Sequence, residues 1–417
     1  MATVVLVGTL DTKGPEYEWL SARLRESGCD VVLVDAGVMP SPVGTVTGDI
    51  DAAAVARRAG HGLEALRANG DRGAAVSAMA DGVEQIVGDL YREGQLDAVL
   101  AVAGSGGSFI AARAMQALPI GVPKVLVSTM ASGDVSPYVG SSDITMMYSV
   151  VDVAGINSVS TQIMGNAVAA AAGMAIHHER RLNESQPQGR PLIGASMFGV
   201  TTQAVDAARQ RLDELGYEVL VFHATGAGGR ALEKLAAGGF LAGVLELTTT
   251  ELADDLVGGV LSAGPDRLTA AGRAGLPQVV APGALDMVNF GAAETVPERF
   301  AGRQFLEHNP TVTLMRTTAD EMAELGGSMG RKLASAHGPT AVLWPLGGVS
   351  AVDAPGGPFH DPEADAAGLA SLRAALRGSA VDLREIGAHL NDASFAVAAA
   401  DHLHQLISTQ ERSHPNV

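Results

Sequence analysis

The chain has 417 residues, of which 47% are hydrophobic, and its formal net charge at pH 7 is −18. This length exceeds one comfortable core, so two domains of roughly 200 residues are expected. The negative charge argues against nonspecific binding to nucleic acid or to an anionic membrane. An acidic protein surface that meets either polyanion releases no counterions in exchange, so binding gains no free energy from that source. The single cysteine, Cys29, leaves no intramolecular disulfide and favours a reducing compartment, so we expect a cytoplasmic protein.

The first predicted strand, Thr3–Gly8, runs into a polar loop that opens a helix. Its continuous apolar run is typical of a parallel strand covered on both faces, and Pro15 suits the first helical position. The loop offers glycine, hydroxyl, carboxylate and ammonium groups from Gly8, Thr9, Asp11, Thr12 and Lys13. Such groups suit phosphate and a divalent cation at the carboxyl edge of a sheet. Because Gly-Lys-Ser/Thr is missing, an ordinary turn with Lys13 in solvent stays an alternative.

Three further strands, Val31–Asp35, Ala98–Ala103 and Lys124–Ser128, alternate with helical patterns, and a helix-rich insertion spans about Ala52–Glu93. This alternation predicts a parallel sheet with helices on both faces. Asp35 ends the second strand, where a carboxylate can accept hydrogen bonds from ribose hydroxyls. A solvent-facing aspartate is equally compatible with the pattern.

A glycine-rich loop follows the strand Ala98–Ala103 and precedes another predicted helix. Glycine lets backbone N–H groups approach an anion, and the helix dipole favours negative charge there. The expected cradle comprises Gly104, Ser105, Gly106, Gly107 and Ser108. Phe109 stands where a full Gly-x-Gly-x-x-Gly motif has its last glycine, so close strand-to-helix packing without a ligand is the competing interpretation.

The loop after Lys124–Ser128 is polar and is expected to line the same crevice. It offers Ser132 to a nucleotide, and either Asp134 or Asp143 to a metal ion. The apolar segment Ala167–Ile176 is about half the length of a membrane span and is expected to be a buried packing helix.

The segment Asn183–Arg190 is a linker by composition, so the predicted domains are residues 1–183 and 191–417. The second half repeats the strand and helix alternation, and Thr225–Arg230 forms a second glycine turn. Its predicted strands are Leu192–Met197, Glu218–His223, Leu241–Leu247, Gln278–Ala281, Val312–Met315, Ala341–Trp344 and Val381–Ile386. Both domains are therefore expected to be α/β and Rossmann-like, each with a mostly parallel sheet.

Polar residues of the second domain supply candidates for acid/base chemistry, namely His223, Glu246 and Asp286 near predicted strand ends. Thr248 and Glu251 have the spacing of a capping box, which would explain Glu251 without chemistry. For the group His360, Asp361 and Asp365, a metal role competes with a helix start at Asp361.

Six longer strings carry a family resemblance. They are Gly-Thr-Leu-Asp-Thr-Lys-Gly at 8–14, Ser-Thr-Met-Ala-Ser-Gly-Asp at 128–134, Met-Met-Tyr-Ser-Val-Val-Asp-Val-Ala-Gly-Ile-Asn at 146–157, Gly-Ala-Ser-Met-Phe-Gly-Val-Thr-Thr at 194–202, Phe-His-Ala-Thr-Gly at 222–226 and Pro-Gly-Ala-Leu-Asp-Met-Val-Asn-Phe-Gly at 282–291. The chain resembles an ATP-binding family of unknown function typified by the N-terminal half of the tomato mosaic virus resistance protein of tomato. The resemblance implies two Rossmann-like domains, ATP on the first domain and a homodimer, with no settled reaction.

The leading hypothesis is a homodimeric ATP-binding protein with Lys13 and loop amides on the phosphates and Asp11 on Mg²⁺. A second hypothesis is an enzyme that acts on a small carboxylate or sugar-acid-like metabolite, either at the second domain or at an interdomain cleft, through His223, Glu246 and Asp286. A third is a nucleotide-responsive interaction module without turnover.

Overall fold

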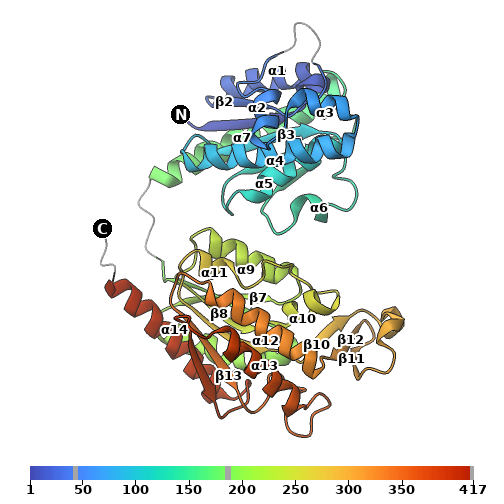
Figure 1. Cartoon of the computed structure of the whole chain (residues 1–417). Coiled ribbons are helices and arrows are strands. Elements are labelled where there is room, and N and C mark those ends of the chain that lie inside the picture. Colours follow the sequence, from blue (N-terminus) through green and yellow to red (C-terminus); the bar gives the residue numbers. More distant parts are fainter. Residues whose placement is uncertain (41–45, 184–188, 414–417) are drawn as a thin grey trace. The chain divides into compact units, whose positions relative to one another are not determined.

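The computed structural model describes residues 1–40, 46–183 and 189–413. The chain divides into two compact α/β units, residues 1–187 and 188–417 (Figure 1). Most of the predicted linker, residues 184–188, lies outside the described residues.

The first domain is built on a five-stranded parallel sheet with the order β2-β1-β3-β4-β5. Its strands are β1 Thr3–Gly8, β2 Asp30–Asp35, β3 Ala98–Ala103, β4 Lys124–Ser128 and β5 Thr145–Tyr148. Sequence patterns predicted four of these strands, but β5 was missed because it is short and half-exposed. Its helices are α1 Leu10–Glu26, α2 Ala52–Arg58, α3 Leu63–Asn69, α4 Arg72–Arg92, α5 Ser105–Ala117, α6 Ser136–Val139 and α7 Ser158–Asn183.

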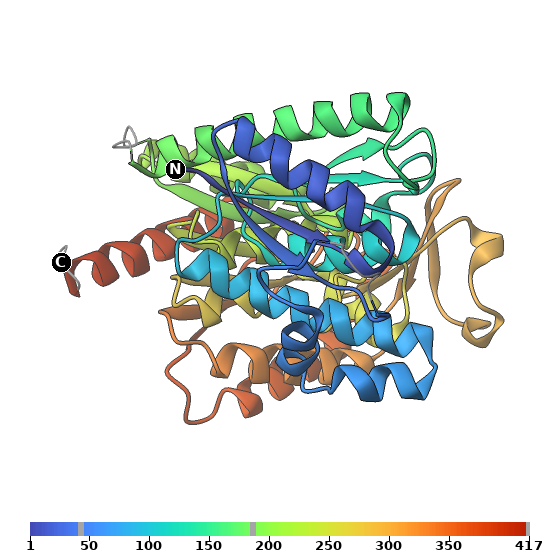
Figure 2. The same ribbon diagram turned by 90° about the horizontal axis from the view of Figure 1, so that it is seen from above.

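Helices cover both faces of this sheet, as expected. Val4 and Leu6 of β1 pack with α1 and α7, whereas Val5 and Val7 pack with α2, α4 and α5. Figure 2 shows α1 and α7 side by side on one face of the sheet. The alternation along β1 is what a strand buried on both faces requires.

Two helices differ from their predicted bounds. α1 begins at Leu10, one turn earlier than predicted, and is interrupted at Lys13, whose φ is −133°. Pro15 lies in the first turn of the main helix that follows the kink, as its type favours. α7 has 26 residues and is long and apolar enough to cross a membrane by length and composition alone. Its face with Met164, Ala167 and Ala171 packs against the sheet, as a core helix does.

The second domain has a six-stranded parallel sheet, β14-β13-β9-β8-β6-β7, and a three-stranded antiparallel sheet, β10-β12-β11. The strands are β6 Leu192–Met197, β7 Glu218–His223, β8 Gly243–Thr248, β9 Gln278–Gly283, β10 Met287–Phe290, β11 Phe305–Asn309, β12 Val312–Arg316, β13 Thr340–Pro345 and β14 Asp382–Ile386. The predicted strand Val312–Met315 exists, but it pairs antiparallel with β10 and β11 outside the main sheet.

Helices complete the second domain. They are α8 Thr202–Glu214, α9 Ala227–Ala237, α10 Thr250–Val257, α11 Ala270–Arg273, α12 Ala319–Ala334, α13 Pro362–Ala375 and α14 Ala393–Ser413, with short 3₁₀ turns at Gly199–Thr201, Ala293–Thr295 and Glu298–Phe300. The helix start predicted at Asp361 is confirmed, because its carboxylate accepts a hydrogen bond from the Ala364 amide at 3.1 Å.

Tyr17 of α1 joins the two central strands of the first sheet. Backbone pairing between β1 and β3 reaches only Leu6 and Leu100. Beyond that point the buried Tyr17 hydroxyl donates to the Val7 carbonyl at 2.5 Å and accepts from the Val102 amide at 3.0 Å. Burial raises the pKa of this phenol and keeps it protonated. The side chain therefore replaces a missing step of the β-ladder.

We expect Tyr17→Phe to destabilise the protein by about 1–3 kcal/mol, because it leaves buried backbone groups without a partner. Denaturant unfolding followed by circular dichroism measures this change, with Tyr148→Phe, at an exposed position of β5 in the same domain, as the control. An unchanged unfolding midpoint in Tyr17→Phe would show that the bridge contributes nothing.

Candidate functional site at the carboxyl edge of the first sheet

The strand order places a crevice between β1 and β3. From β1 the chain crosses to β2 on one side, whereas β3 leads to β4 on the other side. Ligands of open α/β sheets bind at such a switch point, outside the carboxyl ends of the strands. The two glycine loops predicted from sequence, after Gly8 and at Gly104, both lie there.

A cavity of about 300 Å³, lined by both polar and apolar residues, occupies this crevice. Its lining comes from Thr9 and the first turn of α1, the residues after β2, the start of α4, and the N-cap and first turns of α5. The lining residues are Thr9, Asp11, Thr12, Lys13, Ala36, Val38, Arg72, Val76, Gly104, Ser105, Gly106, Gly107 and Ile110. The structure thus brings together most of the predicted phosphate-site residues.

The N-terminus of α5 opens into this cavity without a cap. Gly104 is the N-cap residue and makes no side-chain capping bond. Within the described residues, no group accepts a hydrogen bond from the amides of Ser105, Gly106 or Gly107. A Cβ atom added to Gly106 would meet only Val76 Cγ2, at 3.9 Å. Three donors at the positive end of a helix dipole therefore have room for an anion.

A more apolar cavity of about 360 Å³ continues from the first one, since the two share Thr12, Val38, Arg72 and Val76. Its other lining residues are Met39, Leu66, Arg67, Gly70, Asp71 and Ala75. We call the two cavities together the switch-point groove. Arg67 and Arg72 were missed at the sequence level, because an arginine in a helix-rich insertion carries no signal of the cavity it borders.

Two aspartates fix the loops around the groove. Asp11 Oδ2 accepts hydrogen bonds from the amides of Val38 and Met39, at 3.1 and 2.8 Å. Asp35 Oδ1 accepts from the amides of Leu10 and Gly37, at 3.1 and 2.8 Å, and burial raises the pKa of this carboxyl group. Asp35 therefore has a structural role, and its contact with a ribose stays a prediction.

The side chains of Thr9, Thr12 and Lys13, which follow β1, also make internal contacts. The Thr9 and Thr12 hydroxyls lie 3.0 Å apart. Lys13 lines the groove, but its ammonium group donates to the Val153 carbonyl in the loop after β5. Contact of Lys13 with a phosphate would require this bond to exchange.

Two residues predicted for the phosphate site, Gly8 and Ser108, do not line the groove. Gly8 packs on the Tyr17 ring, and a Cβ atom at Gly8 would stand 2.1 Å from Tyr17 Cζ. Ser108 is buried, and its hydroxyl lies 2.6 Å from the Ser128 hydroxyl. Both residues therefore support the loops by packing and hydrogen bonding.

The candidates after β4 lie apart from the groove lining. Ser132 and Asp134 are in an exposed turn, where hydrogen bonds from Ser136 lower the pKa of Asp134. Asp143 precedes β5 and binds the buried Lys124 ammonium group at 2.6 Å, at the amino edge of the sheet. The suggestion that Asp143 assists a metal at the carboxyl edge is therefore wrong.

One atom in the groove suits a cation. Asp11 Oδ1 is buried and has no hydrogen-bond partner within the described residues. No group of three His, Cys, Asp or Glu side chains in the same described ranges forms a metal cage. A single carboxylate completed by phosphate oxygens and water is how Mg²⁺ commonly binds beside nucleotides, so these residues fit that ion.

The second domain has the same kind of glycine turn, but its own chain occupies it. Glu251 Oε1 accepts hydrogen bonds from the amides of Gly226 and Gly229, at 2.7 and 3.0 Å. Glu251 Oε2 binds Arg267 Nε at 2.6 Å. The capping box predicted for Thr248 and Glu251 is wrong, since α10 begins after Thr249. Arg267 was not foreseen, and nothing in its sequence neighbourhood marks it as buried.

The three second-domain candidates make contacts in different places. Glu246 pairs with the buried Arg267, and Asp286 accepts a hydrogen bond from the Ser350 hydroxyl at 2.7 Å. His223 is exposed and its ring contacts Phe198. The structure does not join these residues in one contact network.

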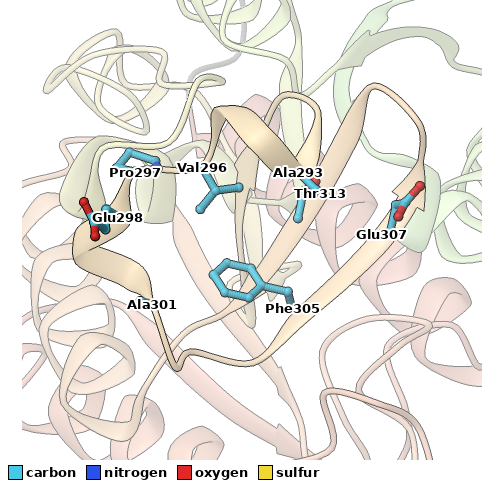
Figure 3. A pocket seen from close by; sticks show the side chains of 8 residues that line it. All are labelled: Ala293, Val296, Pro297, Glu298, Ala301, Phe305, Glu307 and Thr313. Carbon is cyan, nitrogen blue, oxygen red and sulfur yellow. The ribbon is translucent and has the colours of Figure 1, made fainter.

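A further pocket of the second domain, of about 370 Å³, lies on the antiparallel sheet. Figure 3 shows Val296 and Phe305 pointing into it, with Glu298 and Glu307 at its borders. Its lining contains two carboxylates and no basic residue, so it is a poor site for a phosphate group.

The fold and the groove define an α/β protein with two Rossmann-like domains. The chain belongs to the Uncharacterised protein family (UPF0261), whose N-terminal domain model matches residues 2–180 and whose C-terminal domain model matches residues 190–407.

Relatives cover nearly the whole chain. A "UPF0261 protein" of Clostridium tetani is 48% identical over 96% of this chain and 98% of its own length. The ToMV resistance protein Tm-1(GCR237) of Solanum lycopersicum is 40% identical over 95% of this chain, which spans 55% of the tomato protein. A solved UDP-N-acetylglucosamine 2-epimerase from Rickettsia bellii is 9% identical, with a TM-score of 0.21 over 66% of this chain and 77% of its own. That last likeness supports no inference.

The buried acids near Arg316 predict a pH dependence of stability. Burial raises the pKa of Asp286 to about 7, and burial together with a hydrogen bond to Asp353 raises that of Asp365 to about 8. An unfolded aspartate titrates near pH ~3.9. Stability from these groups is therefore fully present below pH ~4 and is lost as the pH rises towards ~8.

We expect the free energy of unfolding to fall by more than about 1 kcal/mol between pH 5 and pH 9. Asp365→Asn, which mimics the protonated acid, should reduce this fall, whereas Asp361→Asn at the helix cap should not. Urea titrations at both pH values measure the difference. An equal fall in the wild type and in Asp365→Asn would contradict the assignment.

Proposed function

We propose that the first domain binds ATP, together with Mg²⁺, in the switch-point groove. One observation carries the proposal: the groove contains both backbone amides without an acceptor and, next to them, an apolar cavity. The amides of Ser105, Gly106 and Gly107 suit phosphate oxygens, and the cavity beside Leu66 and Ala75 suits a base. A nucleotide has this combination of a charged end and a flat, largely apolar end.

Local positive charge supports an anionic ligand despite the net charge of −18. Lys13, Arg67 and Arg72 all line the groove. Arg67 is engaged with Glu64 and with the Val38 carbonyl, whereas Arg72 is exposed at the N-terminus of α4. Since no ion pair of Arg72 is found in the part of the chain that the structure describes, it can bind a phosphate group without breaking one.

The contrast between the two glycine turns supports the choice of domain. The α9 turn already holds the Glu251 carboxylate, which Arg267 balances from the other side. A phosphate entering there would have to displace a buried ion pair, which is costly. Among the described residues, no internal anion occupies the α5 turn, so we assign the nucleotide to the first domain.

Magnesium would be held by Asp11 Oδ1 in this proposal, with the Thr9 and Thr12 hydroxyls nearby. The ion would screen the phosphate charge from Asp11 and Asp35. We also propose a homodimer in the cytoplasm, on the strength of the family resemblance and of the single-cysteine composition.

The two alternative functions, an enzyme and an interaction module, differ in whether the protein turns over a substrate. An enzyme acting on a small carboxylate would use His223, Glu246 and Asp286, yet Glu246 is neutralised by Arg267 and Asp286 is buried. These contacts argue against that chemistry. Phosphate release from ATP in the presence of a metabolite panel tests the enzyme, and binding without any product supports an interaction module.

We expect Gly106→Ala to weaken ATP binding by about 10- to 150-fold, because its methyl group would hold a phosphate away from the loop amides. The fold should survive, since the methyl group meets only Val76. Gly173→Ala, on α7 with no atom within 4 Å of the added Cβ, is the matched control. Isothermal titration calorimetry with Mg-ATP measures the two affinities. Equal affinities of the two variants would contradict the proposal that ATP binds at the start of α5.

Lys13→Ala should weaken ATP binding by about 1.5–3 kcal/mol, the value of a charge-assisted contact. Calorimetry against the wild type measures this loss. An unchanged affinity would remove Lys13 from the phosphate site while leaving the loop amides in place.

A further inference from the structure

The loop between β5 and α7, residues 149–157, combines exposed apolar side chains with a strained backbone. Val150, Ile156 and Val151 are 60%, 42% and 37% exposed. Val150 has a φ of 63°, a conformation that is rare for a β-branched residue. We call this segment the 149–157 loop. Strain of this kind persists only where surrounding contacts hold it.

Two side chains of α1 hold the middle of the loop. Lys13 donates from its ammonium group to the Val153 carbonyl. Glu16, which is buried, accepts a hydrogen bond from the Gly155 amide at 2.5 Å. The cavity between the loop and the side chains of Val102, Val127 and Met164 has a volume of only about 10 Å³, so the loop is packed closely on the domain.

The ends of the loop are fixed independently of α1. The Ser149 amide donates to the Ser128 carbonyl at 3.2 Å, which continues the edge of β4. The Asn157 side chain accepts from the amides of Val159 and Ser160, at 3.0 and 2.9 Å, and so caps α7. A change in the tethers would therefore be confined to residues 150–156.

One ammonium group serves two places, because Lys13 lines the switch-point groove and also holds Val153. A phosphate is a charged acceptor and competes well against a neutral carbonyl. We propose that nucleotide binding draws Lys13 away from Val153 and thereby loosens the 149–157 loop. This coupling rests on the proposed function. It means that the mobility of the 149–157 loop changes with the presence of a nucleotide in the groove.

Linkage makes the coupling reciprocal: if ATP loosens the loop, then loosening the loop must favour ATP. Glu16→Gln weakens a tether and should tighten ATP binding by up to about fivefold relative to its control. The control is Glu18→Gln, which removes the same charge from an exposed position of the same helix. A purely structural Glu16 would give weaker binding or no difference.

Hydrogen exchange measured by mass spectrometry tests the coupling directly. Mg-ATP should slow exchange in peptides covering 104–110 and speed it in peptides covering 149–157. In Lys13→Ala, exchange of the 149–157 loop should already be fast without nucleotide and should not rise further with it.

The outcomes separate the two proposals. Slower exchange at 104–110 with an unchanged 149–157 loop would overturn the coupling and leave ATP binding in place. No effect of Mg-ATP on either segment would overturn the proposed function, and the coupling with it. Unchanged exchange of the loop in nucleotide-free Lys13→Ala would show that the tether does not hold it, whatever the nucleotide does.

Discussion

The site depends on the divergence of β1 and β3 at their carboxyl ends. Parallel pairing stops at Leu6 and Leu100, and the buried Tyr17 hydroxyl bridges the gap that follows. Gly8 must be glycine because its backbone lies against the Tyr17 ring. The bridge stabilises the floor while the two loops above it stay apart, and the groove is the space between them.

The second domain shows what the same topology does when the chain fills the opening itself. Hydroxyls of Thr201 and Thr248 meet at 2.7 Å beyond the last paired residues of β6 and β8. Glu251 occupies the glycine turn, and Arg267 compensates its charge. The second sheet repeats the strand order of the first and adds β14, yet the glycine turn is open in one domain and filled by Glu251 in the other.

Sequence patterns predicted the main sheets well, because apolar runs and the turns between them are local properties. The sequence patterns did not predict side-chain positions that depend on contacts between distant parts of the chain. Ser108 has a site-like position in the sequence but turns towards Ser128, and Glu251 has capping spacing but serves a distant turn. Arg72 and Arg267 carry no local signal, since only the tertiary fold places one at a groove and buries the other. A single sequence records none of these long-range choices.

A crystal structure of the protein grown with Mg²⁺ and a non-hydrolysable ATP analogue tests the central claim most directly. We predict electron density for phosphates against the amides of Ser105, Gly106 and Gly107, and for the base beside Leu66 and Ala75. Density confined to the second domain, with the switch-point groove empty, would contradict the account.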